Sequence, residues 1–164
     1  MEILDVINDK DEVIRQAREN EIYEKKLLHR IIHILIFNDK GEMAMQYRSK
    51  YKPFCPNHWS TTVGGRVGAG ESYEQAAKRE FQEELNTLTD FEFLDKFHYK
   101  NLESGHQAML TIYKTIYNGP FDINPEEVEK LAYFPIPKIK EMIGSGEKFH
   151  PELLFILKKH YFNK

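Results

Sequence analysis

The chain has 164 residues, of which 41% are hydrophobic and 30% are charged, and its formal net charge is −3 at pH 7. This composition predicts one compact domain with a substantial core, and without a lysine or arginine run it argues against a nucleic-acid polymer as partner. Cys55 is the only cysteine, which excludes an internal disulfide. The apolar runs are far shorter than the ~20 residues of a membrane span and the first residues lack a signal-peptide pattern, so we expect a cytoplasmic protein outside the membrane.

The order of strands and helices indicates an α/β protein. Hydrophobic alternation, turn residues and helix caps predict these elements in chain order: strands at 2–7 and 12–15, a helix at 16–25, strands at 30–37, 42–48 and 59–64, a helix at 72–85, strands at 91–100, 106–117 and 130–134, a helix at 135–143 and a last helix from Pro151. This order favours an α/β/α sandwich with a mixed central sheet. We expect a single domain over residues 1–164, with an N-terminal extension at about 1–28.

The helix predicted at 72–85 has well-marked ends. Ser72 and Gln75 form a capping-box pair, which satisfies backbone donors of the first turn. Five apolar residues at helical spacing are expected to face the core: Tyr73, Ala77, Phe81, Leu85 and Leu88. One face of the helix therefore packs, and the adjoining face is free to bind.

An acidic cluster occupies that adjoining face. Glu80, Glu83 and Glu84 lie three and four residues apart, so on a helix they repel one another unless a positive group lies between them. Carboxylate oxygens favour Mg²⁺, Mn²⁺ or Ca²⁺, and Mg²⁺ commonly shares its ligand shell with substrate phosphates. We therefore expect a metal site and a phosphate-containing substrate.

The acidic helix and the turn before it resemble the signature box of the Nudix superfamily. The positions that carry the resemblance are Gly65, Glu71, Arg79, Glu80, Glu83 and Glu84. The resemblance implies the sandwich fold expected above, with Mg²⁺, or Mn²⁺ in its place, on the three clustered glutamates. It also implies catalytic roles for Glu83, Glu84 and Glu71, while Arg79 ties the carboxylates in place.

The box departs from the family pattern at its end. Asn86 replaces the usual glycine and Thr87 replaces the apolar residue that follows it. Asparagine tolerates positive φ better than most residues, so we expect the helix to end there in a left-handed turn.

Four residues are candidates for binding the substrate. Gly64 and Gly65 allow backbone amides to approach an anion, and Arg48 and Arg66 could contact phosphate oxygens. Turn geometry and ion pairs at a sheet edge remain equally good explanations for these residues. The general base is left open between a glutamate of the box and Glu103 in the loop at 101–105.

The resemblance outside the box points to the branch that contains type I isopentenyl-diphosphate isomerases and their hydrolase-like relatives. It rests on Leu4-Asp5-Val6, Leu28-His29-Arg30, Phe37-Asn38, Gln46-Tyr47-Arg48-Ser49 and Asn57-His58-Trp59. Gly64 stands where the isomerase has its cysteine and Arg66 where it has a metal-binding histidine. This change favours hydrolysis, because isomerisation needs the cysteine and an acid on opposite sides of the substrate.

Three functions are therefore weighed. The favoured one is Mg²⁺-dependent hydrolysis of a diphosphate linkage in a nucleoside diphosphate derivative or a related small molecule. The alternatives are an isopentenyl-diphosphate isomerase that uses a displaced cysteine, for which only Cys55 is available, and a catalytically silent Nudix module that binds a ligand. His29 and His33 share one face of a predicted strand, where hydrogen-bonded roles are favoured over metal ligation. Domains of this size can form a homodimer.

Overall fold

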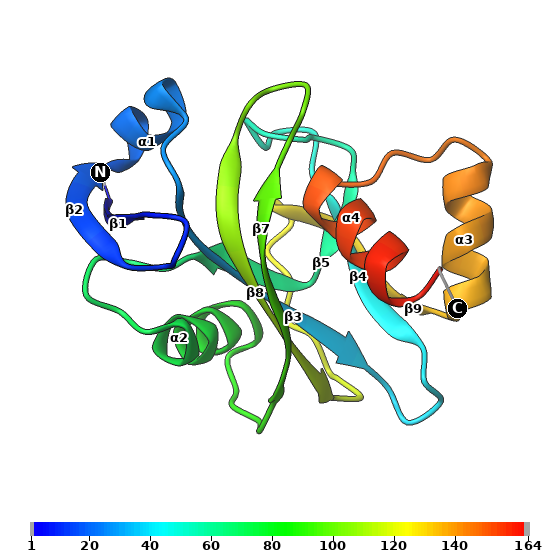
Figure 1. Cartoon of the computed structure of the whole chain (residues 1–164). Helices are drawn as coiled ribbons and strands as arrows, with labels where there is room; N and C mark the ends of the chain where they lie inside the picture. The colour runs from blue at the N-terminus through cyan, green and yellow to red at the C-terminus, as the bar shows by residue number, and fades with distance from the viewer. Residues whose placement is uncertain (1, 163–164) are drawn as a thin grey trace.

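The computed structural model describes residues 2–162 (Figure 1). Its elements are β1 (Ile3–Ile7), β2 (Val13–Arg18), α1 (Glu19–Lys25), β3 (His29–Phe37), β4 (Met43–Arg48), β5 (Trp59–Thr61), β6 (Val63–Arg66), α2 (Tyr73–Leu85), β7 (Glu92–Lys100), β8 (Gln107–Ile116), β9 (Val128–Phe134), α3 (Ile136–Gly144) and α4 (Pro151–His160). None of the helices among these residues combines the length and the apolar character needed to cross a membrane.

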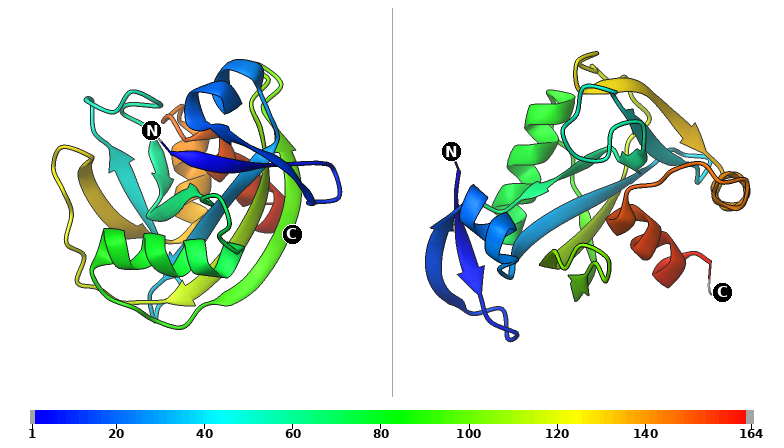
Figure 2. Two further views of the ribbon diagram at one scale, coloured as in Figure 1. Left: turned by 90° about the vertical axis from the view of Figure 1, so that its left-hand side faces the viewer. Right: turned by 90° about the horizontal axis from the view of Figure 1, so that it is seen from above.

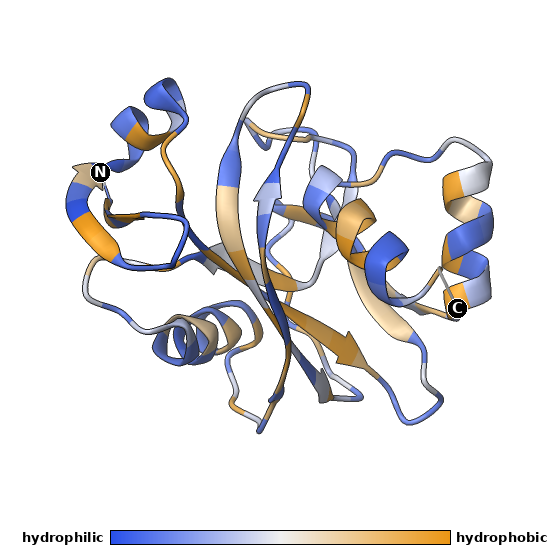
Figure 3. Cartoon of the chain, viewed as in Figure 1, coloured by the Kyte–Doolittle hydropathy of each residue, from blue (hydrophilic) through white to orange (hydrophobic). Residues whose placement is uncertain are grey.

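A seven-stranded mixed sheet forms the centre of the molecule. Its main path is β5-β4-β3-β8-β7, with β6 paired to β3 and β9 paired to β4. β3 and β8 are parallel along their full length, whereas the other neighbours are antiparallel. β3 is buried on both faces, and Figure 3 shows the hydrophobic residues concentrated along it, as expected for a central strand.

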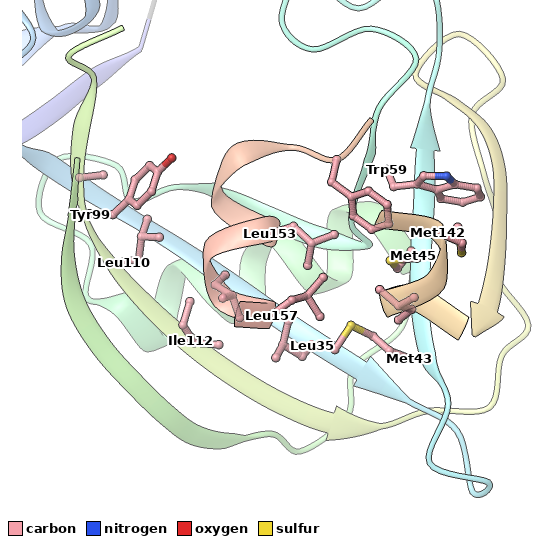
Figure 4. Packing of buried hydrophobic residues seen from close by; sticks show 14 residues of the cluster. Leu35, Met43, Met45, Trp59, Tyr99, Leu110, Ile112, Met142, Leu153 and Leu157 are labelled. Carbon is pink, nitrogen blue, oxygen red and sulfur yellow. The ribbon is translucent and has the colours of Figure 1, made fainter. Parts of the chain in front are cut away.

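Two hydrophobic cores cover opposite faces of this sheet. One packs α3 and α4 against the strands and is shown in Figure 4; it includes Leu35, Met45, Leu110, Leu153 and Leu157. The other packs α2 against the opposite face and includes Ile32, Ile34, Ala77, Phe81 and Leu85. The predicted α/β/α sandwich with a mixed sheet is therefore confirmed.

The N-terminal hairpin and α1 lie to one side of the sandwich (Figure 2). β1 and β2 form a separate two-stranded sheet with a small core of Leu4, Val6, Ala17 and Ile22. The hairpin joins the main body through Ile7, which packs with Leu28 and Met109. The helix predicted at 16–25 is shorter than expected, because residues 16–18 extend β2 and α1 begins at Glu19.

The structure corrects two further predictions. The single strand expected at 59–64 is two strands with different partners: β5 pairs with β4, and β6 pairs with β3. β3 and β4 pair antiparallel across the turn at 38–41 through one register pair, Phe37 with Met43, and then diverge, which leaves β3 free to pair with β6. Leu88 does not join the apolar stripe, because it lies beyond the end of α2 and is 57% exposed.

Candidate active site

Helix α2 is fixed at both ends by local interactions. The Ser72 hydroxyl accepts from the Gln75 amide at 3.1 Å, and the Gln75 side chain accepts from the Ser72 amide at 2.9 Å, which confirms the capping box. Asn86 ends the helix with φ of 53°, the left-handed conformation expected of it. The box helix therefore starts and stops where its sequence indicates.

The glycine turn brings the sheet backbone against the acidic face of α2. A Cβ atom placed on Gly65 would lie 2.9 Å from Glu80 Oε2 and closer still to Oε1. Only glycine leaves room for a carboxylate at this position on β6. Gly65 and Glu80, which are 15 positions apart in the sequence, are thus in contact in the structure.

Arg79 links the carboxylates of the box. Its Nε and Nη2 donate to the two oxygens of Glu71 at 2.7 and 2.8 Å, and its Nη1 donates to Glu80 Oε1 at 2.8 Å. Glu83 Oε2 lies 3.5 Å from the same Nη1. Glu71 in turn accepts from the Gly68 amide at 2.8 Å, so the turn, the helix and the arginine form one network.

The carboxylates of this network differ in their electrostatics. The hydrogen bonds from Arg79 lower the pKa of Glu71. Burial raises the pKa of Glu80 although Arg79 opposes the shift. Burial also raises the pKa of Glu84 well above its usual range, and the charges of Glu80 and Glu127 add to this effect. Burial and mutual repulsion therefore disfavour the ionised forms of Glu80 and Glu84, and a positive ligand between α2 and β6 would stabilise them.

We call Glu71, Arg79, Glu80, Glu83 and Glu84 the acidic wall. Its oxygen donors suit a hard divalent cation, and Gly65 leaves space beside them. Within residues 2–162, no three acidic, histidine or cysteine side chains are grouped closely enough to hold an ion as they stand. Glu83 is 58% exposed, so its carboxylate is accessible to a ligand from solvent. The residues thus fit a divalent cation by chemistry and by space.

A cleft of about 1170 Å³ opens beside the acidic wall. It lies where β3 and β4 diverge, and residues from β3, β4, β6, α2 and the start of α4 line it. Gly64, Gly65, Glu80, Glu83 and Glu84 are among the lining residues. The volume is somewhat above the range of about 300–1,000 Å³ that is usual for small-molecule sites, so the cleft has room for a whole small-molecule substrate.

The two arginines predicted to bind substrate also line the cleft, but each has protein partners. The Arg48 guanidinium donates to the carbonyl oxygens of Phe54 and Cys55, at 2.8 to 3.2 Å, and holds the proline-containing loop. Arg66 pairs with Glu2 and Glu19 of the N-terminal extension at 3.0 and 3.1 Å. The explanation by ion pairs thus applies to Arg66, whereas Arg48 has no carboxylate partner among the described residues.

Two residues considered in the sequence lie outside the lining of the cleft. Glu103 is exposed in the loop between β7 and β8 and is not among the lining residues, although Asn101 and Ser104 of the same loop are. Cys55 is half-buried near Arg48, and burial raises the pKa of its thiol, which keeps it protonated and weakly nucleophilic.

The sequence did not reveal a second polar group in the cleft. Glu152, from the first turn of α4, accepts from His33 Nε2 at 2.8 Å, and His33 Nδ1 lies 2.7 Å from Thr61 Oγ1. His150 lies beside them, and burial lowers its pKa to about 4, so it is neutral at pH 7. His33 and Glu152 are 119 positions apart, so no local pattern could have paired them.

The match to a family model agrees with this geometry. The NUDIX domain model matches residues 27–154. A Nudix hydrolase of Streptomyces coelicolor is 34% identical over 148 residues, which cover 89% of this chain and 81% of that protein.

Solved structures show the same fold. The crystal structure of DR0079 from Deinococcus radiodurans has a TM-score of 0.84 at 25% identity, covering 98% of this chain and 99% of that one. The NUDIX domain of NrtR from Shewanella oneidensis, complexed with ADP ribose, has a TM-score of 0.60 at 15% identity over 87% of this chain and 96% of that one. From the family match, the relatives and the box geometry together, the chain belongs to the Nudix family, as a hydrolase acting on pyrophosphate bonds.

Proposed function

We propose that this protein hydrolyses a diphosphate linkage in a small-molecule derivative, such as a nucleoside diphosphate derivative, with Mg²⁺ held at the acidic wall. The observation that carries the proposal is the close approach of Glu80 to Gly65 at the edge of a cleft that Glu83 and Glu84 also line. This arrangement puts carboxylates beside a backbone that can approach a phosphate. Nudix enzymes generally use divalent metal ions, which supports a cation here.

Each residue of the acidic wall has a distinct part in this proposal. Glu80, Glu83 and Glu84 would hold the ion, which supplies positive charge to the phosphate oxygens and lowers the pKa of the attacking water. Arg79 fixes Glu71 and Glu80 through its guanidinium and so orients the carboxylates. Gly64 and Gly65 would present the backbone to the substrate, and Arg48, which also lines the cleft, would supply positive charge to its phosphate groups.

We assign the general base to Glu83 or Glu84 rather than to Glu103. Both line the cleft, whereas Glu103 does not. A base must come within hydrogen-bonding distance of the water that it deprotonates, directly or through another water. Geometry therefore favours a glutamate of the acidic wall.

The alternatives have less support. An isomerase would need a cysteine facing the substrate, but Cys55 is absent from the cleft lining and its raised pKa disfavours a thiolate. A silent binding module would not need the network that Arg79 builds around the carboxylates. Calorimetry with Mn²⁺ separates that module from an enzyme, since hydrolysis by the proposed route requires metal binding.

We extend the proposal to the domain organisation. The whole chain is one Nudix domain, and about residues 1–28 form an extension before the start of the family match at residue 27. Arg66 joins this extension to the edge of the cleft through Glu2 and Glu19, which supports a structural role for it beside the site.

The test is hydrolysis of a panel of diphosphates with Mg²⁺ by the wild type and by Glu83→Gln. The variant should lose on the order of 10²-fold or more in kcat, because a metal ligand is replaced by a neutral amide. Glu74→Gln is the matched control, since Glu74 lies on the same helix, is 65% exposed and pairs only with Lys78 among the described residues. Full activity of Glu83→Gln would refute the proposed metal role, and a wild type inactive on the whole panel would refute the hydrolase function.

A further inference from the structure

His29 lines the cleft and has a buried ring nitrogen without a hydrogen-bond partner among the described residues. The residue is 3% exposed, lies on β3 and lines the cleft, and its Nε2 makes no hydrogen bond within residues 2–162. An unsatisfied buried polar atom is costly, so such an atom commonly marks the place of a ligand or an ordered water.

The protonation state of His29 follows from its other nitrogen. Nδ1 lies 3.0 Å from the carbonyl oxygen of Leu27, which can only accept, so Nδ1 carries the proton. Burial lowers the pKa of His29, which leaves the ring neutral at pH 7. Nε2 is therefore an unpaired lone-pair acceptor on a residue that lines the cleft.

Glu152 adds a second acceptor to the same part of the cleft. Its Oε1 is engaged by His33, while Oε2 has no hydrogen-bond partner among the described residues, and its side chain is 17% exposed. Burial acts to raise the pKa of Glu152, but His33 and the neighbouring histidines outweigh it, so the pKa lies below its usual value and the carboxylate is ionised at pH 7. Glu152 and His29 lie near enough to influence each other's charge.

We propose that His29 Nε2 and Glu152 Oε2 form an acceptor lobe that binds hydroxyl or amino groups on the non-phosphate half of the substrate. This proposal rests on the proposed function in one respect: it assumes that the diphosphate half of the substrate is bound at the acidic wall. Binding an apolar group here would remove water from both acceptors without giving them a hydrogen-bond donor. Such binding is unfavourable, so the lobe selects against apolar groups. The substrate of this site therefore carries hydrogen-bond donors and is not a simple alkyl diphosphate.

The experiment compares two diphosphates with five carbons each, ribose 5-diphosphate and n-pentyl diphosphate. The wild type should prefer the ribose compound. The preference is measured as the ratio of kcat/KM values with Mg²⁺, and as the ratio of Kd values by calorimetry in which Ca²⁺ replaces Mg²⁺. His29→Leu should lower this preference about tenfold through the KM of the ribose compound, since one hydrogen bond is lost with little change in volume. Glu152→Gln should lower it as well.

His98→Leu is the matched control, because His98 is exposed on β7 and is not among the cleft-lining residues. It should leave the preference unchanged. Equal binding of the two ligands by the wild type would mean that water alone satisfies the acceptors and would overturn the lobe. An equal loss for both ligands in His29→Leu would also overturn it, since that result indicates a structural role. A wild type that hydrolyses neither ligand counts against the proposed function, while calorimetry still decides the lobe.

Discussion

The two sides of the cleft are built in different ways. The acidic wall comes from one turn and one helix, and Arg79 reaches Glu71 and Glu80 within a span of ten residues. The acceptor lobe joins His29 on β3 to Glu152 in the first turn of α4, and the hydrogen bond that fixes Glu152 comes from His33, 119 positions away in the sequence. The acidic wall depends on local spacing, whereas the acceptor lobe depends on the packing of the whole domain. We therefore expect substitutions in the acidic wall to lower activity and substitutions in the acceptor lobe to change substrate selectivity or stability.

The largest expected effect is that of Gly65→Ala on the acidic wall. The new Cβ would collide with the Glu80 carboxylate, which is the end of a flexible side chain and can move away. We expect kcat to fall by more than about 10²-fold, because a shift of about 1 Å in a reacting group has that effect. The midpoint of thermal unfolding should change little.

Gly144→Ala is the control for this substitution, since a Cβ there meets nothing within 4 Å. Its activity should equal that of the wild type. Unchanged kcat in Gly65→Ala would show that the position of Glu80 is irrelevant to turnover, and the acidic wall would lose its assigned part.

A smaller effect is expected for Arg79→Lys. Lysine keeps the charge but cannot make the two parallel hydrogen bonds to Glu71 while also reaching Glu80. We expect about a tenfold loss in kcat and in affinity for Mg²⁺, measured by activity titration with the metal. Lys78→Arg, on an exposed position of the same helix, provides the comparison. If both variants match the wild type, the guanidinium does not orient the carboxylates.

The smallest effect is expected on the stability of Glu152→Gln. Loss of the charged hydrogen bond with His33 should lower the free energy of unfolding by about 1–2 kcal/mol at pH 7, measured by urea denaturation. Because the pKa of Glu152 is lowered in the folded state, its contribution is fully present above the ordinary value of 4.5 and is lost as the pH falls through the folded value. The difference between the two proteins should therefore shrink below about pH 4.5, and a difference that does not depend on pH would contradict an ionised Glu152.

Most of the fold could be predicted from local patterns. The capping box at Ser72 and the left-handed turn at Asn86 depend on near neighbours, and the structure confirms them. The division of residues 59–66 into β5 and β6 could not be predicted, because it depends on two partner strands that diverge. Leu88 was misplaced because the periodicity continued past the point where Asn86 ends the helix.

The site could be predicted only in part for the same reason. The contact between Arg79 and Glu80 could be anticipated because both residues lie on one helix, whose geometry sets their distance. The partners of Arg66 come from the N-terminal extension, and Glu152 reaches the cleft through the packing of α4, so neither contact leaves a pattern in the local sequence. His29 was correctly placed on one face with His33, but its free nitrogen became visible only in three dimensions.

The divided segment from Trp59 to Arg66 has a consequence for how this architecture can diversify. This continuous stretch of backbone pairs first with β4, through β5, and then with β3, through β6. The width of the cleft between β3 and β4 is thereby set by main-chain hydrogen bonds and not by the identity of side chains. Substitutions on β3 or α4 can thus exchange one recognised chemical group for another without rebuilding the frame that carries the hydrolytic machinery.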